Sequence, residues 1–71
     1  MVKVWETRVD LRYDVWVERV EPYKGKLVIF DGEQEELLAE REVTISYDAP
    51  FGPDAGDVSE WAAMALEIID A

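Results

Sequence analysis

The chain has 71 residues, of which seventeen are Asp or Glu and seven are Lys or Arg, so its formal net charge is -10 at pH 7. This length suits one small domain spanning 1–71, and the charge argues against direct binding to nucleic acid or to an anionic membrane. Because Cys and His are absent, disulfides, thiol catalysis, zinc fingers and imidazole acid–base chemistry are excluded. No apolar run approaches the roughly 18 residues of a membrane span, so we expect a soluble, cytoplasmic protein.

Apolar residues occupy the odd positions from Trp5 to Val17, with Thr7 as the exception. This period of two indicates a strand with one buried face. We expect one long strand over roughly 3–20, either bent around the core or interrupted by a bulge near Asp10. A turn that contains Pro and Gly follows at 21–25.

A second strand is expected over Lys26–Phe30, and the dipeptide Asp31-Gly32 after it is typical of a type I′ hairpin turn. The segment 33–47 begins with residues of high helix propensity, but a helix there would bury only a thin apolar stripe. We therefore interpret 33–47 as a third strand. Its buried face would carry Leu37, Ala39, Val43, Ile45 and Tyr47.

The stretch from Asp48 to Asp57 is rich in Pro, Gly and Asp, which predicts a loop. Asp57 and Glu60 have the spacing of a capping box, so the helix is expected to begin there and to cover about 58–70. The predicted fold class is α+β, a three-stranded antiparallel meander (βββ) with one C-terminal helix packed on one face.

The negative charge belongs to one half of the chain. Residues 1–30 hold six bases and five acids, whereas 31–71 hold twelve acids and a single base, Arg41. Like charges at this density repel one another and cost stability. The acids either serve only solubility and tolerance of high salt, or they serve a function. Their confinement to one half of the chain favours a function.

Catalysis and metal binding are weakly indicated. Glu36 and Glu40 could share a proton, but a sheet surface offers no pocket to desolvate them, so we expect no enzyme. Asp48, Asp54 and Asp57 could hold a hard cation only weakly, because their spacing is not that of an EF-hand, and we expect neither a metal nor another cofactor.

Two aromatic residues lie outside the buried pattern. Trp16 breaks the polar face of the first strand, and Phe51 lies between two prolines. Each either covers an end of the core or anchors a partner.

The sequence therefore predicts a non-enzymatic acidic binding protein, an inhibitor that occupies a basic, nucleic-acid-binding site on a partner protein. In being very small, acidic and built from a sheet and a helix, the chain is similar to phage DNA-mimic inhibitors of DNA-repair, restriction or CRISPR proteins, although no motif assigns it to one of them. The expected contact residues are Glu33, Glu35, Glu36, Glu40, Glu42, Asp48, Phe51, Asp54 and Asp57.

The alternative is a small accessory or antitoxin-like module without mimicry. A strand over 3–20 would extend beyond its partner strand over 26–30 and leave backbone that a second copy could pair, so a homodimer is expected in either case. A halophilic protein or a designed sequence would show the same composition.

Overall fold

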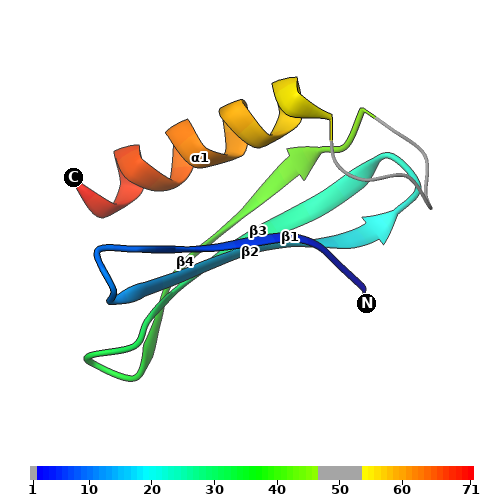
Figure 1. Cartoon of the computed structure of the whole chain (residues 1–71). Coiled ribbons are helices and arrows are strands. Elements are labelled where there is room, and N and C mark those ends of the chain that lie inside the picture. Colours follow the sequence, from blue (N-terminus) through cyan, green and yellow to red (C-terminus); the bar gives the residue numbers. More distant parts are fainter. Residues whose placement is uncertain (1, 47–53) are drawn as a thin grey trace.

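The computed structural model describes residues 2–46 and 54–71 (Figure 1). The strands form one antiparallel sheet in the order β1-β2-β3-β4, so β1 and β4 are its edges. Helix α1 lies across one face of this sheet, as Figure 1 shows. The α+β class and the C-terminal helix are confirmed, and the sheet has four strands instead of the predicted three. The elements are β1 (Val2–Val9), β2 (Tyr13–Glu21), β3 (Lys24–Asp31), β4 (Glu36–Thr44) and α1 (Ala55–Ile69).

The single long strand predicted over 3–20 is wrong, because the chain reverses between β1 and β2. The three residues 10–12 connect them, and paired residues such as Thr7 and Val15 are both odd-numbered. A connection of three residues therefore leaves the odd positions of both strands on the same face. The alternation then looks the same as in one uninterrupted strand.

The type I′ turn predicted at Asp31-Gly32 is also wrong. Asp31 ends β3, and its carboxylate accepts hydrogen bonds from the backbone N–H groups of Glu33 at 3.0 Å and Gln34 at 3.2 Å. Gly32 has no positive φ. It is required instead by a close approach, because a Cβ atom there would lie 2.9 Å from the carbonyl oxygen of Arg12.

The predicted strand over 33–47 is confirmed in its central part, as β4. Ala39 and Val43 lie opposite Ile29 and Gly25 on the helix side of the sheet, as expected. The register shifts next to Phe30, so that Leu37 lies opposite this residue on the open side. The expectation that Leu37 is buried is therefore wrong. Tyr47 lies outside the described residues.

The helix begins three residues before its predicted start, because its N-cap is Asp54 and not Asp57. The Asp54 side chain accepts a hydrogen bond from the backbone N–H of Gly56 at 3.1 Å. Asp57 lies inside α1 with an exposed fraction of 6%. Its two carboxylate oxygens accept hydrogen bonds from the backbone N–H and the hydroxyl of Ser46, both at 2.8 Å. Asp57 thus joins the helix to the end of β4.

The core lies between α1 and the helix side of the sheet. The helix contacts β3 and β4 directly, and from β1 the ring of Trp5 reaches Trp61 with 5.8 Å between the ring centroids. The helix therefore covers the sheet less completely at its β1 edge. The buried apolar residues that form this core are Val15, Val17, Leu27, Ile29, Val43, Ile45, Trp61 and Ala65.

Trp16 lies on the open face of the sheet, half-buried, opposite Val28. Its Nε1–H donates to Glu18 at 3.0 Å, and the ammonium group of Lys3 lies 4.8 Å from the centre of its ring. Val28 has an exposed fraction of only 5%, although no helix covers this face. Trp16 is therefore part of an apolar strip in the middle of the open face and does not cover an end of the core.

Candidate acidic binding surface

Five of the predicted contact residues gather on β4 and on the loop that precedes it. All five are exposed. Because β4 is an edge strand, the backbone on its outer side pairs with no other strand of the sheet. We call these residues the edge acids: Glu33, Glu35, Glu36, Glu40 and Glu42.

Nearby bases neutralise part of this charge. Lys26 Nζ lies 3.7 Å from Glu40, and Arg12 Nε lies 3.6 Å from Glu33. A shallow hollow of about 330 Å³ on the open face also brings Lys24 next to Glu40 and Glu42. Within the described residues the other three edge acids form no ion pair. The unbalanced charge therefore lies at both ends of β4 more than in its middle.

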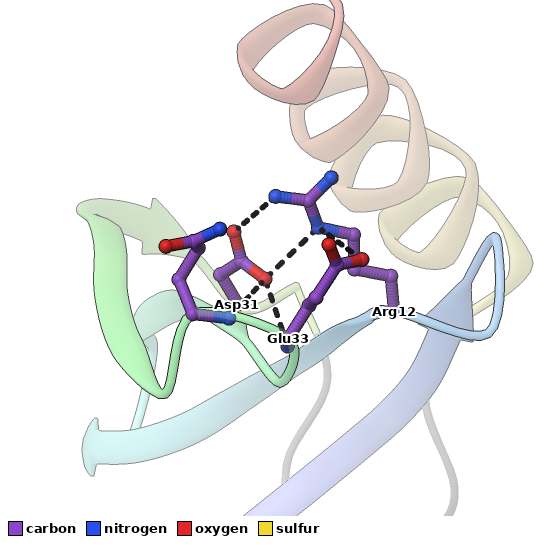
Figure 2. A network of polar contacts seen from close by, with 4 residues as sticks. Arg12, Asp31 and Glu33 are labelled. Atoms are coloured by element: carbon purple, nitrogen blue, oxygen red, sulfur yellow. Dashed lines mark hydrogen bonds and ion pairs between the residues drawn. The ribbon is translucent and has the colours of Figure 1, made fainter.

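The loop that carries Glu33 is fixed by Asp31 and Arg12 (Figure 2). Arg12 donates two hydrogen bonds to the Asp31 carboxylate, from Nε at 3.0 Å and from Nη2 at 2.8 Å. These bonds lower the pKa of Asp31 to about 2, against the effect of burial, and the backbone N–H groups of Gln34 and Glu33 lower it further. Asp31 also raises the pKa of Arg12. The pair stays ionised and holds the two hairpins together at this end of the sheet.

A second group of exposed acids lies along α1, from its N-cap to its C-cap, and only Asp54 of this group was among the predicted contacts. The sequence contains no base after Arg41, so nothing on α1 balances them. Glu42 and Glu67 line a shared hollow of about 460 Å³ between β4 and the end of α1, together with Arg41. The negative surface therefore continues from the sheet edge onto the helix. We call these exposed residues the helix acids: Asp54, Glu60, Glu67 and Asp70.

The structure divides the predicted contact residues into three groups. The edge acids lie together, as expected from one strand and its loop. Asp54 caps α1, and Asp57 is buried against Ser46, so its carboxylate is not part of the exposed surface. Asp48 and Phe51 lie outside the described residues.

The chemistry available to the surface is that of exposed carboxylates, which accept hydrogen bonds from Lys and Arg. In the parts of the chain that the structure describes, no three acidic side chains stand close enough to hold a metal ion. Among the same residues, no helix is both long enough and apolar enough to span a membrane.

No known protein family, curated protein or solved structure matches this chain. Its function has to be inferred from the charge and shape of its own surface.

Proposed function

We propose that the chain is a non-enzymatic inhibitor whose acidic surface occupies a basic, nucleic-acid-binding site on a partner protein. The observation that carries this proposal is the line of exposed edge acids next to a helix without a base. A strand of nine residues such as β4 is about 30 Å long. That length is comparable to one turn of duplex DNA, about 34 Å.

The spacing of the acids supports the same proposal. Glu40 and Glu42 lie opposite Val28 and Lys26 on the open face. Residues two apart on one face of a strand are separated by roughly 6.7 Å, about twice the 3.4 Å rise per phosphate of one DNA strand. A groove whose Lys and Arg side chains follow a phosphate backbone can therefore contact every second position.

Apolar side chains beside the acids supply the contact area that charge alone does not give. Leu37 and Leu38 follow Glu36 at the start of β4 and have exposed fractions of 53% and 42%. Apolar side chains that become buried in an interface slow dissociation, whereas charges at its rim mainly speed association. The surface thus combines fast electrostatic encounter with a small apolar anchor.

The test is elution by competition from immobilised duplex DNA. A cell lysate from which nucleic acids have been removed by precipitation is loaded on the DNA, and the 71-residue chain is added at constant ionic strength. A defined DNA-binding protein should leave the column with the chain. Poly-glutamate of equal total charge is the control for non-specific competition. If the chain elutes nothing beyond what poly-glutamate elutes, the inhibitor proposal is wrong.

Single charge reversals locate the contact. Glu36→Lys lies on the acidic surface and should lower elution, since Glu36 has no ion pair within the described residues. Glu6→Lys is the matched control with the same change in charge, because the exposed Glu6 lies on β1, at the other edge of the sheet from β4. Equal loss of elution in both variants would mean that only net charge matters, which contradicts a specific acidic surface.

A further inference from the structure

The sheet has two open edges, β1 and β4, and open edges readily accept a further strand. A second copy of the chain would bring an identical edge, related to the first by a two-fold axis. Paired residues must lie on the same face of the joined sheet, so each possible register can be tested for the charges it brings together.

Pairing between two β4 edges is opposed by charge. Glu40 and Glu42 lie on the same face of β4. In the registers centred on Glu40, Arg41 or Glu42, one of these glutamates lies opposite Glu40 or Glu42 of the other copy. Opposite side chains in a sheet have Cβ atoms about 4.5–5.5 Å apart, and like charges at that distance are destabilising.

The β1 edge has complementary charges in one register. Glu6 and Arg8 lie on the open face, opposite Trp16 and Asp14 of β2. If Thr7 of one copy lies opposite Thr7 of the other, Glu6 lies opposite Arg8 twice. The two neighbouring registers bring Glu6 opposite Glu6 or Arg8 opposite Arg8. The charges of β1 therefore favour the register centred on Thr7.

The helix side of β1 offers apolar surface in the same register. Trp5 and Val9 lie on this side and are only half-buried, because α1 lies mainly over β3 and β4 and reaches β1 through the contact between Trp61 and Trp5. Centring the pair on Thr7 sets Trp5 opposite Val9 of the other copy, twice, so the apolar layer continues across the interface. A chain of this size without cysteine has few other sources of added stability than such an association.

From these observations we propose that two copies of the chain pair through their β1 edges, in the register centred on Thr7, to form an eight-stranded antiparallel sheet. The two β4 edges then lie at the outer ends of the joined sheet. The inference goes beyond the proposed function and does not rest on it, because the edge acids of both copies stay accessible whether or not they bind a partner.

Sedimentation equilibrium of the full chain tests the association. From low to high micromolar concentration the mass should rise from 8.2 kDa toward twice that value. Glu6→Arg and Arg8→Glu should each abolish the rise, because each sets like charges opposite one another. An equal mixture of these two variants should restore the dimer, since opposite charges face one another again. Mixing would not repair a folding defect, so an unrestored mass with both variants folded by circular dichroism overturns the proposed register.

Cross-linking tests the position of the two-fold axis. The chain has no cysteine, so Thr7→Cys introduces a single thiol that lies opposite itself in the dimer. Under mild oxidation it should form roughly tenfold or more covalent dimer than the control Thr44→Cys at the exposed end of β4, because associated thiols react at a high effective concentration. Equal cross-linking of the two variants, or a mass of 8.2 kDa for the unmodified chain at every concentration, overturns the proposal.

Discussion

Leu11 is the most exposed large apolar side chain of the described residues, with an exposed fraction of 89%. Its φ of 54°, like that of Asp10 before it, lies in the left-handed region. Asp tolerates this region, but a bulky side chain does not, and the cost is about 1–2 kcal/mol. Local stability therefore does not explain why a leucine occupies this exposed and strained position.

Leu11→Gly should raise the free energy of unfolding by about 0.5–1 kcal/mol once the greater chain entropy of glycine is subtracted. Urea denaturation measures the change. The control is Leu37→Gly in the exposed part of β4, where the same substitution should lower stability by a similar amount. If Leu11→Gly is also destabilising, the turn is not strained as the structure indicates.

The ionisation of Asp31 should make the free energy of unfolding depend on pH. Its pKa is lowered to about 2 from an ordinary value of 3.8, so its ionisation favours the folded state. This contribution is complete above the ordinary pKa and is lost as the pH falls toward about 2. Asp31→Asn should therefore be less stable than the unmodified chain at pH 7, and the difference should shrink between about pH 4 and pH 2. Thermal unfolding of both proteins across this range measures the difference, and a constant gap would contradict the ion pair with Arg12.

At the scale of the elements, the joint between β4 and α1 depends on Asp57 more than on the helix cap. Asp57→Ala removes two hydrogen bonds from Ser46 in a buried position and should cost about 1–3 kcal/mol. Asp54→Ala removes an exposed N-cap and should cost about 1 kcal/mol or less. Equilibrium unfolding in urea compares the two variants. A larger loss for Asp54→Ala would contradict the importance of the buried contact between Asp57 and Ser46.

The sequence predicted β4 and α1 because each depends on a local pattern of apolar residues, with Ala39 and Val43 in one and Trp61 and Ala65 in the other. It did not predict the reversal between β1 and β2. Residues 10–12 contain neither Gly nor Pro, and a three-residue connection preserves the alternation of faces. The side on which Leu37 lies depends on a register shift, for which residue type gives no signal.

The sequence predicted which residue types form the candidate surface, but not where this surface begins and ends. The exposed glutamates of β4 follow from alternation along a strand. The burial of Asp57 could not be predicted, because it results from the contact between the helix and Ser46, eleven residues away. The extension onto α1 was signalled by the absence of a base after Arg41, but the predicted contact residues followed this signal only as far as Asp57.

At the scale of the whole molecule, the net charge of -10 should make stability increase with salt. Raising the ionic strength from about 0.01 M to about 1 M shortens the Debye length from about 30 Å to about 3 Å and screens the repulsion. Differential scanning calorimetry should show a rising Tm with NaCl. Each Glu→Lys substitution changes the charge by +2, so the double variant Glu36→Lys, Glu60→Lys has a net charge of -6 instead of -10 and should respond less. A Tm that falls with salt would show that attractive ion pairs outweigh the repulsion.

The central claim is that the acidic surface and a nucleic acid compete for one site on a partner protein. The most direct measurement is the affinity of the eluted partner for a fluorescent duplex, determined by anisotropy at increasing concentrations of the chain. We expect the apparent Kd of the duplex to rise in proportion to the concentration of the chain, with no ternary complex and with a smaller effect of Glu36→Lys. If the partner binds the chain and the duplex together at full affinity, the chain is not a mimic, and an interaction module without mimicry is the better account.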